Sequence, residues 1–324
     1  MDGVAIKNEM STIAPLTELS VVYSELVHEL QKERGMTAGF LGSKGTKFAD
    51  KLKNQRVQTD QKRKKEESFW GKGDFTLKEI KQLNATISQS LQQIASIRQQ
   101  VDSQSISIGK AIGYYTQLNK KLLSVASLNA SISSDSLITK ETIAYYNFLQ
   151  GKERAGIERA VLSGTFAKNA FGEGMYAKFI TLVSEQNVYF DNFNQLSNED
   201  SKSYFTQQLN NSAVKEVTKL RAIAIKKQKD FAIEAEYWFA QSTGRIGQLK
   251  KVENHLGDKI LALVEAKHDQ AFQTMLIHLV VSVILIVLAL MISFYTINEL
   301  TGRVSNLTTV MGTVRHDNDL TVKS

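Results

Sequence analysis

The stretch Glu29-Leu-Gln-Lys-Glu-Arg-Gly-Met-Thr-Ala-Gly-Phe-Leu-Gly42 places a positive charge, Arg34, on the apolar stripe of a long helix. Apolar residues upstream of it recur every three or four positions, which is the period of an amphipathic helix. They are Leu16, Leu19, Tyr23, Leu26 and Leu30. Arg34 comes four positions after the last of them, and Ala38 continues the stripe. The sequence therefore predicts packed helices with the Arg34 guanidinium buried between them.

Small residues crowd the sequence around Arg34, namely Gly35, Ala38, Gly39 and Gly42. Because a helix is more stable with Ala or Leu than with glycine, these positions indicate a need for space. A buried guanidinium keeps its proton, so it requires an anion or several acceptors. Two interpretations follow. Either a small anion binds beside Arg34, or Arg34 pairs with a carboxylate at a contact between helices.

The composition predicts an all-α fold. The chain has 324 residues with one proline and 19 glycines, and it lacks the period-two alternation of half-buried strands. The expected helices are 7–41, 46–70, 76–103, 106–132, 136–170, 175–196, one that ends near 229 with a break near 210–212, and one from 235 onward. Long helices joined by short turns bury their apolar stripes against one another, which predicts a helical bundle.

Several kinds of chemistry are excluded by the residue types. The chain has no cysteine, so it offers no disulfide, thiolate nucleophile or cysteine-ligated zinc. Its five histidines show no metal-ligand spacing, and no phosphate-binding or dinucleotide-binding glycine pattern is present. We therefore expect no catalytic residue, no metal, no cofactor and no enzymatic activity.

Much of the formal net charge of +7 gathers in residues 51–65. This segment has no aromatic residue to stack on bases, so it is interpreted as a solvated helix face. We expect no nucleic-acid partner. Within the segment, Arg56 and Asp60 stand four positions apart, which predicts an intrahelical ion pair.

Residues 275–295 form a run of 21 residues without a formal charge. As a helix this run is about 31 Å long, which matches a bilayer core of roughly 30 Å. We expect it to cross a membrane rather than to form a buried core helix. The opening Met1-Asp-Gly-Val shows no signal peptide. Either a span precedes this sequence, or the N-terminal part stays in the cytoplasm.

A second arginine, Arg159, lies on a small and apolar helix face within residues 151–164. If its helix neighbours that of Arg34, the two guanidinium groups can converge on a small planar oxyanion. Glu33 and Glu158, which precede the two arginines, are then expected to restrain them. The alternative is an internal Arg–Glu network that only fixes the register of the helices.

Two further arginines are lower-ranked candidates for ligand binding. Arg154 lies nearer another face of the helix that carries Arg159. Arg245 stands on the helix that leads toward the apolar run, where contact with a ligand would be transmitted most directly.

Residues 26–45 closely resemble the opening signature of the NIT (nitrate- and nitrite-sensing) domain. Gln55-Arg56, Thr59-Asp60 and Gly156-Ile-Glu-Arg-Ala-Val-Leu-Ser163 are similar to further motifs of that family. The resemblance covers about residues 19–265 and implies an all-helical domain built from two up-down four-helix bundles.

In the NIT family, arginines on the bundle helices bind nitrate or nitrite. By motif match, the resemblance assigns that role first to Arg34 and next to Arg159, with Arg154 and Arg245 following. It does not identify which of these anions is bound, because both require similar donors.

Residues 297–324 resemble the start of a HAMP signalling domain, particularly at Leu307, Met311 and Asn318-Asp-Leu-Thr321. The proline usual near the start of that domain is absent, and Arg303 stands at about its place. A HAMP domain is cytoplasmic, which implies a periplasmic sensor domain and a location in the bacterial inner membrane.

Together these features predict three parts: a NIT-like sensor domain at 1–270, a transmembrane helix at 271–296 and a partial HAMP-like segment at 297–324. The function expected is the ligand-sensing region of a transmembrane chemoreceptor. Its expected partners are nitrate or nitrite, the membrane, a second copy in a homodimer and downstream signalling proteins. The alternatives are the input region of a sensor kinase or cyclic-dinucleotide enzyme, and a membrane-tethered scaffold without a small ligand. A cytoplasmic nucleic-acid regulator is a further alternative, which the apolar run disfavours.

Overall fold

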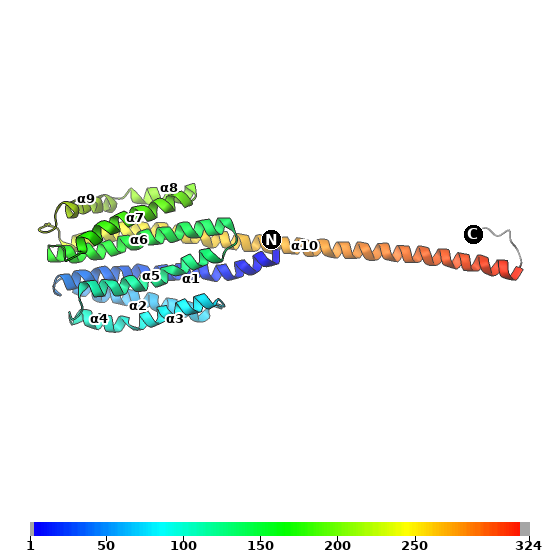
Figure 1. Ribbon diagram of the computed structural model, residues 1–324, viewed down its shortest axis with the longest axis horizontal. Coiled ribbons are helices and arrows are strands. Elements are labelled where there is room, and N and C mark those ends of the chain that lie inside the picture. The colour runs from blue at the N-terminus through cyan, green and yellow to red at the C-terminus, as the bar shows by residue number, and fades with distance from the viewer. Residues whose placement is uncertain (1–2, 318–324) are drawn as a thin grey trace. The chain divides into compact units, whose positions relative to one another are not determined.

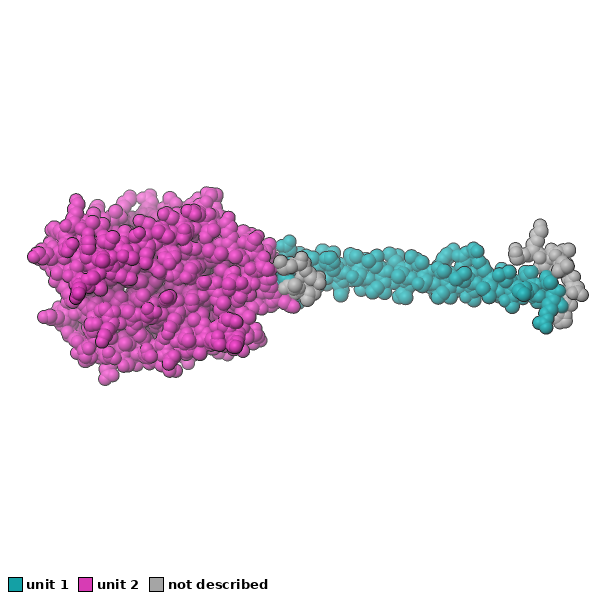
Figure 2. Space-filling model, viewed as in Figure 1, with its two compact units in different colours: residues 1–7, 268–324 teal, residues 8–267 magenta. Residues whose placement is uncertain are grey.

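The computed structural model describes residues 3–317 of the chain. Within that range every regular element is a helix, apart from an isolated antiparallel bridge between Ala170 and Lys229. The prediction of an all-α fold is therefore confirmed. The chain divides into two compact units: one comprises Asn8–Lys267, and the other holds the remainder of the described chain (Figure 2).

The first four-helix bundle of the larger unit is built from five helices that run side by side (Figure 1). They are α1 (Gly3–Gly42), α2 (Ala49–Lys72), α3 (Lys78–Gln92), α4 (Ile94–Asp102) and α5 (Ile108–Ile132). Helices α3 and α4 occupy one place in the bundle, where a single helix over 76–103 was expected. The break arises at Gln93, whose N–H bonds the Ser90 carbonyl three residues back, a 3₁₀-type turn.

The second bundle is again formed by five helices (Figure 1). They are α6 (Ser136–Lys168), α7 (Met175–Leu196), α8 (Glu199–Leu209), α9 (Ser212–Lys226) and the first part of α10 (Ala235–Asp317). Helices α8 and α9 share one place, and the break between them falls at Asn210 and Asn211 as predicted. The Asn211 side chain accepts a hydrogen bond from the Ala213 N–H and so caps α9.

Helices α6 and α3 begin differently. The Asp135 carboxylate accepts hydrogen bonds from the N–H groups of Leu137 and Ile138 at the start of α6. By contrast, neither Asp74 nor Thr76 caps α3, which begins after Leu77 without a side-chain cap.

The contact between α1 and α6 joins the two bundles and positions the candidate site. The predicted stripe of α1 is buried, and Arg34 and Ala38 on that stripe are both 0% exposed. Helix α6 is buried along almost its whole middle section, residues 147–166, with Arg154 as the exception. Since α6 is surrounded on all sides, any charged residue on it must find its partner inside the protein.

Helix α10 contains the apolar run. Among the described residues it is the one helix long and apolar enough to cross a membrane. Its most apolar window of 18 residues has a mean hydropathy of 3.1, and none of that window is buried. The run is therefore not a core helix of this chain. The HAMP-like residues Asn318-Asp-Leu-Thr321 lie outside the described residues.

Candidate functional site

Arg34 on α1 is held by a carboxylate from α6. Its Nη1 and Nη2 donate to the two oxygens of Glu153 at 2.5 and 3.2 Å, and Nη1 also donates to Thr116 Oγ1 at 3.0 Å. Two amides donate to the same carboxylate, Gln31 Nε2 at 2.6 Å and Asn119 Nδ2 at 3.3 Å. The Arg34 Nε is buried and has no hydrogen-bond partner among the described residues.

Arg159 on α6 is equally buried, at 0% exposed, but no carboxylate in the described chain bonds it. Its Nη1 donates to Thr243 Oγ1 at 2.9 Å, and its Cζ lies 4.9 Å from the centre of the Phe239 ring. Within the described part of the chain, its Nε and Nη2 have no hydrogen-bond partner. These two groups form one edge of the guanidinium, which can bond two oxygens of one anion.

The electrostatics of the two arginines are coupled. Burial, together with the neighbouring charge of Arg34, lowers the pKa of Arg159 to about 9, and the Glu153 carboxylate partly offsets this effect. Arg159 therefore stays protonated at neutral pH as a buried cation. By contrast, the pKa of Arg98 is raised by its bonds to Glu33 and Asp60, despite the opposing effect of burial. The pKa values of Arg98, which bonds two carboxylates, and Arg159, which bonds none, thus shift in opposite directions.

Glycines allow each of the two arginines to pack closely against the helix that carries the other arginine. A Cβ added at Gly35 on α1 would lie 3.2 Å from Arg159 Nε and 2.8 Å from Phe239, and one at Gly156 on α6 would lie 2.8 Å from Arg34 Nη2. Each guanidinium therefore packs over a glycine of the other helix. The small residues around Arg34 allow this close approach, and the expected open space is filled by these side chains.

The indole of Trp238 fixes the backbone beside this site. The side chain is 0% exposed, and its Nε1 donates to the Arg159 carbonyl at 3.0 Å. Arg159 is thus bonded to α10 twice, through its main-chain carbonyl to Trp238 and through its side chain to Thr243.

The carboxylates expected to restrain the two arginines have other partners. Glu33 bonds Arg98 at 2.8 Å and Tyr115 at 2.8 Å, and Glu158 bonds Arg221 at 2.5 Å. The prediction that they restrain Arg34 and Arg159 is wrong, because successive residues of a helix point about 100° apart.

Sequence reasoning missed Glu153, which takes this role for Arg34. Glu153, Gly156 and Ala160 stand three and four positions apart on α6, so the period of the buried stripe could have found it.

The expected Arg56–Asp60 pair does not form either. Arg56 bonds Asp102 at 2.9 Å, whereas Asp60 bonds Arg98 and Arg63. Both residues lie on α2 and reach across to α4, and within α2 Asp60 pairs with Arg63 instead of Arg56.

The two lower-ranked arginines lie in other networks. Arg154 is half-buried, donates to Glu185 at 3.1 Å and Tyr189 at 3.3 Å, and also bonds Gln150. Arg245 donates to Gln186 at 2.9 Å and lies 3.6 Å from Glu158. The structure therefore brings Arg34 and Arg159 together and leaves the other two with partners of their own.

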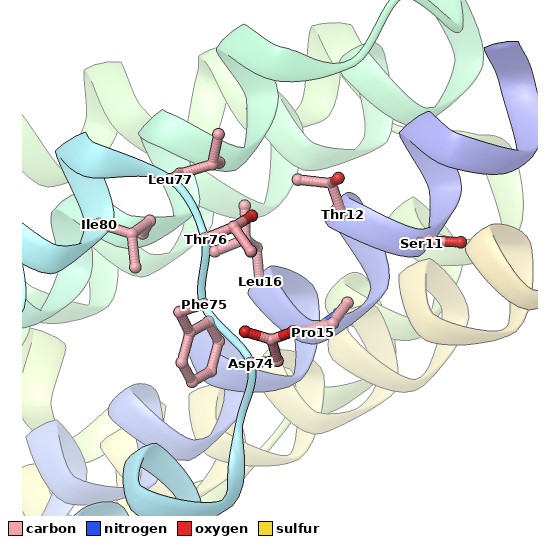
Figure 3. Close-up of a pocket in the computed structure, with 9 residues that line it drawn as sticks. All are labelled: Ser11, Thr12, Pro15, Leu16, Asp74, Phe75, Thr76, Leu77 and Ile80. Carbon is pink, nitrogen blue, oxygen red and sulfur yellow. The ribbon is translucent and has the colours of Figure 1, made fainter.

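No metal site accompanies the arginines in the part of the chain that is described, since it contains no cluster of three potential ligands among His, Cys, Asp and Glu. A surface pocket of about 300 Å³ lies between α1 and the segment that links α2 to α3 (Figure 3). Its lining includes Pro15, Phe75 and Ile80 but none of the four candidate arginines. The arginine site is an internal contact, distinct from this pocket.

Comparison with known proteins connects these features to nitrate sensing. Residues 25–261 match the family model described as nitrate and nitrite sensing (NIT). A nitrate regulatory protein of Klebsiella oxytoca is 29% identical over 275 residues, which are 82% of this chain and 68% of that protein. The solved structure of the NasR transcription antiterminator has a TM-score of 0.73 at 26% identity, and the match covers 82% of this chain and 78% of that one.

These relatives overturn the expected function. They are a nitrate regulatory protein and a transcription antiterminator, so the prediction of a membrane chemoreceptor is wrong. A long apolar helix indicates a membrane span, but it does not specify which output the sensor controls. The expectation that the chain has no nucleic-acid partner is not supported, because one of these relatives is a transcription antiterminator. Both relatives are named as regulators. The match to residues 25–261 covers well over half of the sequence, and the chain belongs to the nitrate- and nitrite-sensing (NIT) family.

Proposed function

We propose that this chain is a regulatory protein that senses a nitrate- or nitrite-type anion through Arg34 and Arg159. The observation that carries the proposal is the buried Arg159 edge, whose Nε and Nη2 lack partners among the described residues. A buried cation without a counter-ion destabilises a fold, so its presence at the contact of α1 and α6 calls for a compensating role.

The donors suit a small planar oxyanion. The Nε and Nη2 of Arg159 can bond two oxygens of one anion side by side, and the Arg34 Nε offers a further donor from α1. Such an anion would stabilise the contact between α1 and α6 by neutralising Arg159. Arg154 and Arg245 are left out of the proposed site because each is bonded elsewhere.

We further infer that the apolar run of α10 crosses a bacterial inner membrane, with 1–270 as the sensor domain, 271–296 as the span and 297–324 as a HAMP-like segment. The support is the length and mean hydropathy of the exposed window. A homodimer, downstream signalling partners and a periplasmic sensor domain stay predictions of this proposal.

Titration calorimetry on the full chain in detergent tests the anion site. We expect sodium nitrate or sodium nitrite to release or absorb heat with one site per chain, and Arg159→Gln or Arg34→Gln to weaken binding at least about tenfold. Arg154→Gln is the matched control and should bind as the parent does. Unchanged affinity in both site variants would remove the proposed site.

A further inference from the structure

The buried charges at the proposed site do not balance. Arg34 and Arg159 are 0% exposed and Glu153 is 3% exposed, so these three side chains leave one positive charge inside the protein. Around them, Glu29 pairs with Lys32 and Glu33 with Arg98, whereas Glu253 is shared by Lys152 and Lys250 and Glu158 is shared by Arg221 and Arg245. Among the described residues, Glu153 is the one carboxylate that bonds Arg34, and no carboxylate bonds Arg159. At the contact of α1 and α6 itself, the charge is therefore set by the two arginines and Glu153.

Glu153 is a fixed negative charge at this place. Arg34 bonds both of its oxygens, and the amides of Gln31 and Asn119 hold the same carboxylate. Glu153 also acts electrostatically on Arg159. An incoming anion thus meets two cations and one resident anion at the same contact.

We propose that Glu153 makes the site selective for monovalent oxyanions, an inference that rests on the function proposed above. One monovalent anion brings the summed charge of Arg34, Arg159 and Glu153 to zero, whereas a divalent anion would give these groups a net negative charge. Glu153 also repels any bound anion, and it repels a divalent anion about twice as strongly as a monovalent one. It acts as a specificity-determining residue through its charge.

Anions of the same shape but different charge show whether the site selects its ligand by charge or by shape. Perchlorate and sulfate are both tetrahedral, but they carry one and two negative charges. We would titrate the full chain in detergent with the sodium salts of nitrate, perchlorate and sulfate, at constant ionic strength held with sodium gluconate. We expect nitrate and perchlorate to bind at least about tenfold more tightly than sulfate. The inference would be overturned if perchlorate bound as weakly as sulfate.

The two proposals fail in different ways. If nitrate and nitrite do not bind the parent chain, the proposed function itself fails. If nitrate binds and sulfate binds equally well, the anion site stands and the selectivity assigned to Glu153 is wrong.

Variants of Glu153 test its role directly. We expect Glu153→Gln to raise the affinity for both anions, with a logarithmic gain for sulfate about twice that for nitrate. Glu153→Asp keeps the charge and should keep the discrimination. The matched control is Glu33→Gln, which removes a buried carboxylate bonded to Arg98 and should leave the nitrate-to-sulfate ratio within about twofold.

A folding defect does not remove the test. Circular dichroism would establish that each variant folds. If Glu153→Gln does not, the parent chain with perchlorate and sulfate and the Glu153→Asp variant still decide the question. Selection by charge is contradicted if a folded Glu153→Gln variant still prefers monovalent anions over sulfate as strongly as the parent does. It is also contradicted if Glu153→Asp loses that preference.

Discussion

Replacement of Arg159 by methionine should stabilise the protein while abolishing its response to nitrate. Arg159 is fully buried with two N–H groups that lack partners in the described chain, and each such group costs about 1–3 kcal/mol. Methionine is apolar, of similar length and adaptable in shape. The change also loses the Thr243 hydrogen bond, worth about 1 kcal/mol, and the contact with the Phe239 ring.

The net effect expected of Arg159→Met is a gain of about 2 kcal/mol in the free energy of unfolding, comparable to the gain of about 1–4 kcal/mol found when buried ion pairs are replaced by apolar groups. For a bundle of this size the midpoint of thermal unfolding should rise by about 4–8 °C. Sodium nitrate should raise the midpoint of the parent in proportion to the logarithm of its concentration and leave that of Arg159→Met unchanged.

Thermal unfolding of the full chain in detergent, followed by circular dichroism, measures both effects. Arg98→Met is the matched control, because Arg98 bonds the buried Glu33 through two nitrogens at 2.8 and 2.9 Å. Breaking that pair should destabilise the protein by about 3–5 kcal/mol. A loss of more than about 1 kcal/mol in Arg159→Met without nitrate would refute the reasoning, since Arg159 would then have a stabilising role of its own.

Further predictions concern packing and pH. Gly156→Ala places a Cβ 2.8 Å from Arg34 Nη2, so it should destabilise the protein by about 1–3 kcal/mol and weaken nitrate binding in calorimetry. Gly71→Ala adds a Cβ to helix α2 with no atom within 4 Å of it, so this change should instead stabilise the protein by about 0.5–1 kcal/mol. A Gly156→Ala variant more stable than Gly71→Ala would contradict the contact between Gly156 and Arg34. Burial and the adjacent Glu67 raise the pKa of Glu66 from 4.5 to about 7, so its carboxyl binds a proton more tightly when folded. The parent should therefore lose on the order of 2 kcal/mol of stability as the pH rises from about 4.5 to 7, and Glu66→Gln should not, as measured by urea unfolding across that range.

The helices and the buried stripes could be predicted closely from the sequence. Apolar periodicity depends on which face of a helix is covered, so it correctly indicated that Arg34 and Arg159 are buried. It did not indicate the short break at Gln93, because that residue keeps helical backbone angles and carries no turn signal.

The partners of the buried charges could not be predicted from periodicity alone. Glu33 and Arg56 lie near expected partners in the sequence, but they bond residues on other helices, Arg98 and Asp102. Such pairs depend on how the helices are rotated and aligned relative to one another. The bonding of Arg34 to Glu153 has the same origin, since 119 positions separate them in the sequence.

The bond from Trp238 to the Arg159 carbonyl gives the protein its own optical probe. The chain has two tryptophans, and only Trp238 lies at the site. Indole emission responds to the fields and hydrogen bonds around the ring, so an anion that enters beside Arg159 should alter the fluorescence of Trp238. In a Trp70→Phe background that signal comes from one residue, and anion entry can be timed by stopped-flow mixing without any attached dye.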